Sequence, residues 1–187
     1  MQVILSAHFD LAQPVRHMKL ADGKLSGLVD NFAGVFAAYQ ANRRTGVPVY
    51  LTNFEENGFG GAIDVAIKLN KENTLVIVVD TVKVSDLPAG TIASVANVYN
   101  VDVQDLKKKF GGKVFFFEEL FEPTEDETWI YGHRFGFAAF YFGIPIPKDY
   151  HETENNVSLK TIDAATDALV DIVNYLRRSR SLHKESI

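Results

Sequence analysis

Short apolar segments alternate along the chain with longer segments in which apolar residues recur at helical spacing. The apolar segments at 3–6, 47–54 and 75–79 are rich in β-branched residues and predict strands. The segments at 31–44 and 60–69 carry apolar residues three and four positions apart, which predicts two amphipathic helices. The first half of the chain therefore reads strand, helix, strand, helix, strand.

The second half continues the alternation and ends in a long amphipathic helix at 158–178. Before it, the pattern predicts strands at 93–99, 113–117 and 144–147 and helices at 101–110 and around 132–142. Parallel strands need long crossover connections, which helices supply. We therefore expect an α/β fold with three layers, α/β/α, around a mostly parallel, mixed central sheet.

Composition and charge limit the classes of function. A chain of 187 residues with 47% hydrophobic residues fits one compact domain. The net charge of -5 argues against a nucleic-acid partner, and the apolar runs are too short for a membrane span. We see no signal peptide and expect a cytoplasmic protein. Without cysteine, any metal ion would be held by His, Asp and Glu.

Acidic and imidazole side chains gather where predicted elements end or begin. These residues are His8, Asp10, Asp30, Glu55, Glu56, Asp80 and His151. In open α/β sheets, ligands bind outside the carboxyl ends of the strands, so we expect these side chains to share one cleft. So many carboxylates in one cleft would repel one another unless cations were bound between them.

Each of these features also has a simpler explanation when it is taken alone. Asp30 could be a helix cap, and the Glu55–Glu56 pair a solvated strand end. We expect the acids of FEPTEDETW to form a solvated loop, and the aromatic stretches VFFFEEL and GFAAFYFGIP to belong to the core. The glycines of NGFGGA are expected to shape the turn into a helix. We assign no metal role to His17, His133 or His183.

The ordered stretches SAHFD, LVDNFAG, NFEENGFGGA, VVDT and YHETEN resemble the co-catalytic zinc aminopeptidases, a superfamily of zinc exopeptidases with leucyl-type and glutamyl-type members. The resemblance covers most of the chain and implies a zinc-exopeptidase-like fold. The short interval between His8 and Asp30 leaves no room for the β-domain that glutamyl-type relatives insert there. We therefore expect a single catalytic domain over residues 1–187, without an inserted lid or dimerisation domain.

The resemblance also implies a set of metal ligands. His8 and Asp80 would hold one divalent ion, Glu56 and His151 would hold a second, and Asp30 would bridge the two. These nitrogen and oxygen ligands suit zinc, with manganese or cobalt as alternatives.

Two further residues receive catalytic roles from the resemblance. Glu55 would be the general base, which takes a proton from the attacking water and delivers it to the leaving amine. Asp10 lies two residues after His8 and would accept the second ring N–H of that histidine, which fixes its tautomer.

The implied function is a metal-dependent exopeptidase, an aminopeptidase acting on a peptide or small amide. Two alternatives stay open: a single-zinc acyltransferase or deacylase of the same superfamily, and a catalytically silent binding module. Relatives carry additional sequence before the H-x-D strand, so we expect an exposed sheet edge that a homo-oligomer would cover. The stretch YGHRFGF replaces an acidic turn of the relatives, and Tyr131, His133 or Arg134 could stabilise an oxyanion or a substrate carboxylate.

Overall fold

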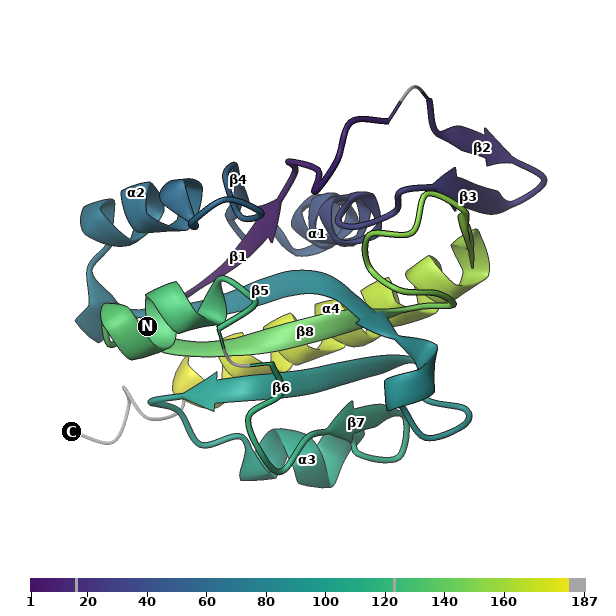
Figure 1. Ribbon diagram of the computed structural model, residues 1–187. Helices are drawn as coiled ribbons and strands as arrows, with labels where there is room; N and C mark the ends of the chain where they lie inside the picture. The colour runs from purple at the N-terminus through teal and green to yellow at the C-terminus, as the bar shows by residue number, and fades with distance from the viewer. Residues whose placement is uncertain (16, 123, 182–187) are drawn as a thin grey trace.

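A six-stranded mixed sheet lies at the centre of the molecule (Figure 1). The computed structural model describes residues 1–15, 17–122 and 124–181. Across the sheet the strands are β4 (Val49–Thr52), β1 (Gln2–His8), β5 (Thr74–Lys83), β8 (Ala138–Ile146), β6 (Ala93–Tyr99) and β7 (Val114–Phe116). Neighbouring strands are parallel except for the antiparallel pair β6 and β8. The expected mostly parallel, mixed sheet is therefore confirmed.

Helices cover both faces of this sheet (Figure 1). One face packs against α1 (Phe32–Thr45) and α4 (Leu159–Ser181), and the other against α2 (Gly60–Lys68) and the short π-helix η3 (Trp129–Arg134). The remaining helices are α3 (Gln104–Phe110), η1 (Lys71–Asn73) and η2 (Val84–Asp86). This arrangement confirms the three-layer α/β/α architecture.

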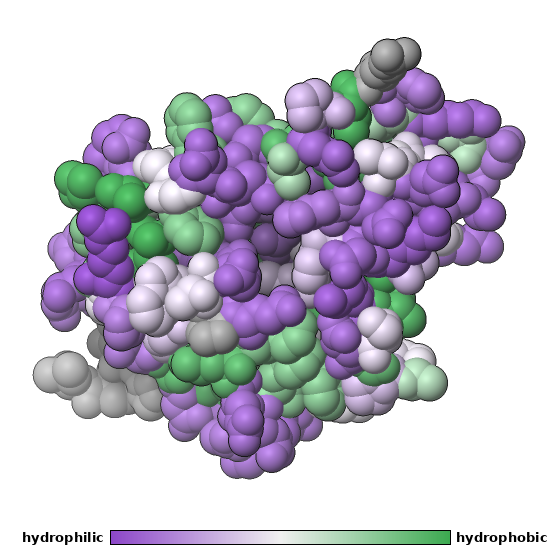
Figure 2. Space-filling model, viewed as in Figure 1, coloured by the Kyte–Doolittle hydropathy of each residue, from purple (hydrophilic) through white to green (hydrophobic). Residues whose placement is uncertain are grey.

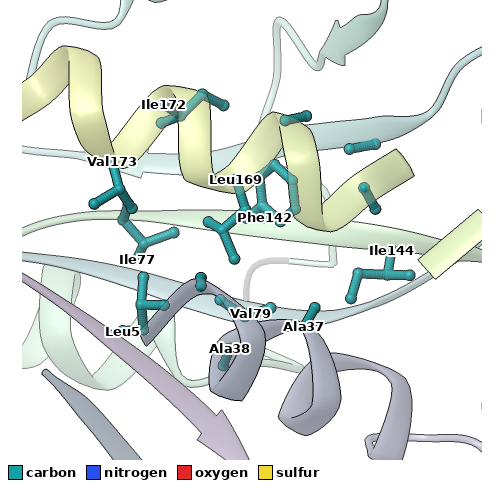
Figure 3. Packing of buried hydrophobic residues seen from close by; sticks show 14 of the residues in the cluster. Leu5, Ala37, Ala38, Ile77, Val79, Phe142, Ile144, Leu169, Ile172 and Val173 are labelled. Carbon is teal, nitrogen blue, oxygen red and sulfur yellow. The ribbon is translucent and has the colours of Figure 1, made fainter. Parts of the chain in front are cut away.

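The larger part of the core lies between the sheet and the helices α1 and α4. Figure 3 shows side chains of the two helices and of the strands meeting there: Leu5, Ala37, Ala38, Ile77, Val79, Phe142, Ile144, Leu169, Ile172 and Val173. Because successive side chains of a strand point to opposite faces, Leu5 and Ala7 of β1 join this core, whereas Ser6 and His8 point to the face of α2 and η3. The alternation thus leaves His8 available to a site at the end of β1.

A second, three-stranded antiparallel sheet has the order β2-β3-β9 and was not predicted. Its strands are β2 (Lys19–Ala21), β3 (Lys24–Gly27) and β9 (Asn155–Ser158). These strands are short and polar, so they lack the apolar pattern that marks a buried strand. Pairing of β3 with β9 fixes the segment that follows His151 against the segment that precedes Asp30.

The helix predicted around 132–142 is wrong. The structure has the short π-helix η3 there, followed by strand β8, and the strand predicted at 144–147 is the end of β8. β8 lies inside the sheet and is buried on both faces, so nearly every residue in it is apolar. Such a run shows no period-two alternation, and periodicity alone does not separate it from a buried helix.

Strand β4 forms one edge of the central sheet. Among the described residues it pairs with β1 alone, and Leu51 at its centre is 53% exposed.

The described part of the chain also contains no helix whose length and apolar character would suit a membrane crossing.

Candidate metal centre

A cavity of about 890 Å³ opens at the carboxyl ends of β1, β4 and β5. Figure 2 shows mostly hydrophilic surface around the central hollow of this face. Six of the seven predicted site residues line the cavity: His8, Asp30, Glu55, Glu56, Asp80 and His151. The structure therefore brings together side chains that are spread over most of the sequence.

Parallel strand pairing explains why these residues meet. His8 is the last residue of β1, which lies between β4 and β5. Glu55 and Glu56 follow the end of β4, and Asp80 lies near the end of β5. Because the three strands run in the same direction, their carboxyl ends reach the same rim of the sheet.

His8, Asp30 and Asp80 form the first possible ligand group, and all three are buried. Nε2 of His8 lies 3.3 Å from Oδ1 of Asp30 and 3.4 Å from Oδ1 of Asp80. A tetrahedral zinc site with bonds of about 2.0–2.1 Å places its ligand atoms about 3.3–3.4 Å apart. The observed spacing is that of ligands around one ion, and it is longer than an optimal N–H···O hydrogen bond.

Asp30, Glu56 and His151 form a second group, whose ligand atoms lie within 4.8 Å of one another. Nε2 of His151 is 3.3 Å from Oε2 of Glu56, again the spacing of two ligands around one ion. Asp30 belongs to both groups, which is the position that a carboxylate bridging two ions would occupy. The donor set therefore fits one or two divalent cations.

The electrostatics of the cavity also favour bound cations. Burial raises the pKa of Asp80 to about 7, because it outweighs the opposing effect of His8, and the charge of Asp30 adds a smaller increase. Burial and the charge of Asp80 raise the pKa of Glu55 to about 10. For His8, burial alone would lower the pKa, but Asp80 and Asp30 outweigh it and hold the pKa above its ordinary value. Positive charge at Nε2 of His8, from a proton or a metal ion, is thus strongly stabilised.

Asp10 makes a different contact from the predicted one. Its Oδ1 lies 3.6 Å from Nδ1 of His8, which is too long for a hydrogen bond. Instead, Oδ1 accepts the backbone N–H of Glu55 and Oδ2 accepts that of Glu56, each at 3.2 Å. Asp10 can bind both backbone amides because each oxygen of a carboxylate accepts a hydrogen bond. Asp10 therefore fixes the turn that carries the predicted base and the neighbouring ligand.

Asp30 is not the cap of α1. Asn31 takes that place, since its side-chain oxygen accepts the backbone N–H of Gly34. The side-chain amide of Asn31 also donates to the backbone oxygen of Val79, at 2.9 Å, which ties the start of α1 to β5 just before Asp80. The peptide bond between Asp30 and Asn31 is cis. Because Asn31 caps the helix, Asp30 is not needed there, and it lines the cavity instead.

The glycines after Glu56 form a tight turn into α2. Gly58 has a φ of 92°, in the left-handed region that favours glycine. A Cβ atom at Gly61 would lie 2.5 Å from the backbone nitrogen of Asn53, so only glycine permits this close approach. The turn thus brings the start of α2 against Asn53, where the backbone N–H of Gly61 donates to the backbone oxygen of Asn53 at 2.8 Å.

One wall of the cavity was not anticipated from the sequence. It is formed by Phe121, Glu122, Thr124, Glu125 and Asp126. The prediction of a solvated loop is wrong for Asp126 and Glu127, which are 5% and 1% exposed. A local signal was present, because the D-x-T spacing allows the backbone N–H of Thr128 to donate to Oδ1 of Asp126, at 2.6 Å, at the start of a helical turn.

The three candidates for an oxyanion-stabilising group do not line the described cavity. The hydroxyl of Tyr131 is buried 3.0 Å from that of Ser6, and the ring of His133 stacks on Trp129. Arg134 is exposed. His17 also lies outside the cavity, and His183 lies outside the described residues.

Comparison with known proteins gives no match to a family model or to a curated protein sequence. Solved structures do match. The aminopeptidase APDkam598 from the archaeon Desulfurococcus kamchatkensis has a TM-score of 0.60 and 20% identity, over 84% of this chain and 51% of that chain. The TET1 peptidase of Pyrococcus horikoshii has a TM-score of 0.59 and 16% identity, over 84% of this chain and 52% of that chain.

Yeast aminopeptidase 1 is a third similar structure, with a TM-score of 0.56 and 14% identity, over 89% of this chain and 48% of that chain. This chain thus spans about half the length of the solved structures that it matches. At these identities the likeness establishes the fold. The resemblance to the co-catalytic zinc aminopeptidases that the sequence motifs indicated is therefore confirmed at the level of the fold.

Proposed function

We propose that this chain is a metal-dependent aminopeptidase that hydrolyses a peptide or small amide. The observation that carries the proposal is the pair of ligand groups that share Asp30, with ligand atoms at the spacing of a zinc site and Glu55 in the same cavity. The three solved structures named above are aminopeptidases or peptidases, which supports the proposal.

In this proposal His8 and Asp80 would hold one ion, Glu56 and His151 would hold the other, and Asp30 would contribute to both. Zinc suits these nitrogen and oxygen donors, and manganese or cobalt could take its place. The bound ions would polarise the amide carbonyl and lower the pKa of the attacking water.

Glu55 is the proposed general base. Its pKa is raised chiefly by burial, and the positive charge of bound ions would oppose that rise and favour the carboxylate. The carboxylate takes a proton from water as the water oxygen bonds to the carbonyl carbon. It then delivers that proton to the amide nitrogen as the C–N bond breaks, so that a carboxylic acid and an amine leave. Asp10 supports both steps by fixing the backbone of Glu55.

A second candidate is a single-zinc acyltransferase or deacylase. The observation in its favour is the unequal burial of the two ligand groups: His8, Asp30 and Asp80 are buried, whereas the side chain of His151 is 59% exposed. One tightly held ion at the buried group would suit acyl transfer better than a dinuclear peptidase mechanism.

We further propose that the chain acts as a single cytoplasmic catalytic domain over residues 1–187 and assembles as a homo-oligomer. The TET1 peptidase forms a tetrahedron or an octahedral shell, and the mature yeast aminopeptidase 1 forms a dodecamer. The open edge at β4 offers one surface for self-association. Light scattering on the full chain tests the assembly, and a monomer at all concentrations would contradict it.

Metal content and turnover, measured on the same samples, test the proposed function. The full chain is reconstituted with zinc, manganese or cobalt, and hydrolysis of aminoacyl amides is followed. We expect two ions per chain and metal-dependent turnover. Glu55→Gln should keep its metal and lose about 10²–10⁴-fold in kcat, whereas Glu72→Gln, at an exposed glutamate outside the cavity, should match the unmodified chain.

Three outcomes would contradict parts of this proposal. Full activity of Glu55→Gln would refute its role as the base. One ion per chain and no peptide turnover would favour acyl transfer. No bound metal at saturating concentrations would leave a catalytically silent binding module.

A further inference from the structure

Asp126 is a buried carboxylate that lines the cavity and lacks a positively charged partner. It is 5% exposed, and among the described residues no Lys, Arg or His lies within ion-pair distance of it. Its donors are neutral: the side-chain amide of Asn97 and both the backbone N–H and the hydroxyl of Thr128. Burial raises the pKa of Asp126 to about 6, so the group is ionised at neutral pH. A buried negative charge without a counter-ion is costly, and a cation in the cavity would offset that cost.

The position of Asp126 is fixed rather than adaptable. Asn97 donates to the backbone oxygen of Phe121 at 2.7 Å, accepts the backbone N–H of Phe121 at 2.8 Å, and donates to Asp126 as well. One side chain of β6 thus holds both ends of the segment that forms this wall. Such a preorganised carboxylate is suited to recognising a ligand.

The wall is far enough from the proposed metal ligands for a substrate to lie between them. Asn97 lies in β6, Asp80 lies in β5, and β8 separates the two strands. Two inter-strand spacings of about 4.8 Å, together with an offset of about two residues along the strands, separate Asp80 from Asn97 by roughly 12 Å. A peptide whose N-terminal residue is bound at the metals could reach this wall with a long side chain.

The surrounding groups favour a long cationic side chain over an anionic one. Glu122 and Glu125 stand beside Asp126, and the rings of Phe121 and Tyr141 also line the cavity and can pack against methylene groups. Lys83 is the one lysine or arginine among the described residues that line the cavity. It is engaged elsewhere, because its Nζ lies 3.8 Å from Asp149 and 3.9 Å from Asp86.

We infer that Asp126 is the specificity-determining residue of a pocket for a positively charged side chain, and that the enzyme prefers substrates with an N-terminal lysine or arginine. The inference rests on the proposed aminopeptidase function. In the complex, the ammonium or guanidinium group supplies the counter-ion that Asp126 lacks, and the aromatic rings cover the aliphatic part of the side chain.

A purely structural role for Asp126 makes a different prediction. Its hydrogen bonds to Thr128 fix the turn that leads into η3, so its loss could disturb the cavity as a whole. A structural defect would lower turnover of all substrates by a similar factor. A specificity-determining role lowers turnover of cationic substrates alone.

The first test compares lysine with norleucine, which has a similar aliphatic chain but no ammonium group. The metal-loaded full chain is given the 7-amido-4-methylcoumarin derivatives of lysine, arginine, norleucine and glutamate. We expect kcat/KM for lysine to exceed that for norleucine by at least about tenfold, the factor that one charge-assisted hydrogen bond commonly supplies. In Asp126→Asn this ratio should fall to near one, because turnover of the lysine substrate falls by a larger factor than turnover of the norleucine substrate. Asp105→Asn, which removes an exposed carboxylate of α3 outside the cavity, should keep the ratio.

Binding to the unmodified metal-loaded chain is measured in parallel by calorimetry, with lysinamide and norleucinamide as ligands, because Asp126→Asn places two amide groups face to face at Asn97 and can fold poorly. Turnover of all four substrates with equal binding of the two amides would overturn the inference and leave the peptidase proposal intact. Tighter binding of lysinamide by at least about tenfold without turnover of any substrate would support the cationic pocket and contradict the peptidase proposal.

Discussion

Replacement of Asp10 by asparagine tests how the turn after β4 is held. The two carboxylate oxygens of Asp10 accept the backbone N–H groups of Glu55 and Glu56, each at 3.2 Å, and its side chain is only 16% exposed. In Asp10→Asn one oxygen remains, and the new amide group points its own N–H at a backbone N–H. One charge-assisted hydrogen bond is lost, which costs about 1.5–3 kcal/mol. This cost corresponds to a factor of about 10–150 in the fraction of molecules with the turn in place.

The expected result is a selective loss of one metal ion. Because the turn carries Glu56, the ion shared by Glu56 and His151 should bind about 10–150-fold more weakly, and the ion at His8 and Asp80 should change less. The two affinities are measured by competition with a chelator, and His151→Ala identifies which of them belongs to the Glu56 ion. Asp22→Asn, in the exposed turn between β2 and β3, is the matched control.

Two results would refute this reasoning. Preferential weakening of the ion at His8 and Asp80 would show that Asp10 acts mainly through the ring of His8, as the motif alone suggested. Unchanged affinities for both ions would show that the turn keeps its conformation without the two hydrogen bonds.

Three further predictions concern the core, the buried acid and the pH dependence of metal binding. Leu169→Ala, at a buried position of α4, should lower the free energy of unfolding by about 2–5 kcal/mol in urea denaturation, and a loss under about 1 kcal/mol would contradict the packing of Figure 3. Asp126 has a folded-state pKa of about 6 against an ordinary value of 3.8, so between these pH values the folded chain keeps a proton that the unfolded chain releases. The contribution of Asp126 to the free energy of unfolding should therefore fall by about 3 kcal/mol as the pH rises from about 4 to about 7. Asp126→Asn should lack this component, and identical pH profiles for the two proteins would contradict it. Metal affinity should drop by about tenfold for each pH unit on acidification, because a proton competes for Nε2 of His8, whose pKa the neighbouring carboxylates raise; an affinity independent of pH would exclude His8 as a ligand.

The elements that the sequence predicts well are those whose environment leaves a local pattern. Strand β5 contains the continuous apolar run 75–79, and α1 begins at a capping asparagine and ends at Gly46 in the left-handed conformation. Strand β8 was partly mistaken for a helix because burial on both faces removes the alternation. The small sheet was not predicted because its strands are held by pairing between strands and not by apolar side chains.

The candidate site also has one part that the sequence could predict and one part that it could not. Its predicted ligands follow strand ends, so they could be found once the order of strands was known. The burial of Glu127 could not be found, because its carboxylate accepts a hydrogen bond from Ser6, 121 positions earlier in the chain. Asp126 is held by Asn97 from another strand. The D-x-T spacing marks a turn at Asp126, but nothing in FEPTEDETW indicates that Asp126 and Glu127 are buried.

The position of β1 in the sheet determines when this strand can pair during synthesis of the chain. The ribosome synthesises β1 before its two neighbours, yet β1 lies between β4 and β5 and pairs with both. Its backbone groups therefore have no sheet partner until those later strands have left the exit tunnel. The ligand group of Asp30, Glu56 and His151 is complete even later, because His151 is synthesised after all strands of the central sheet. If the proposed metal centre forms, capture of its second ion during translation would be confined to the last stage of synthesis, and a nascent chain stalled before residue 151 should bind fewer ions than the full chain.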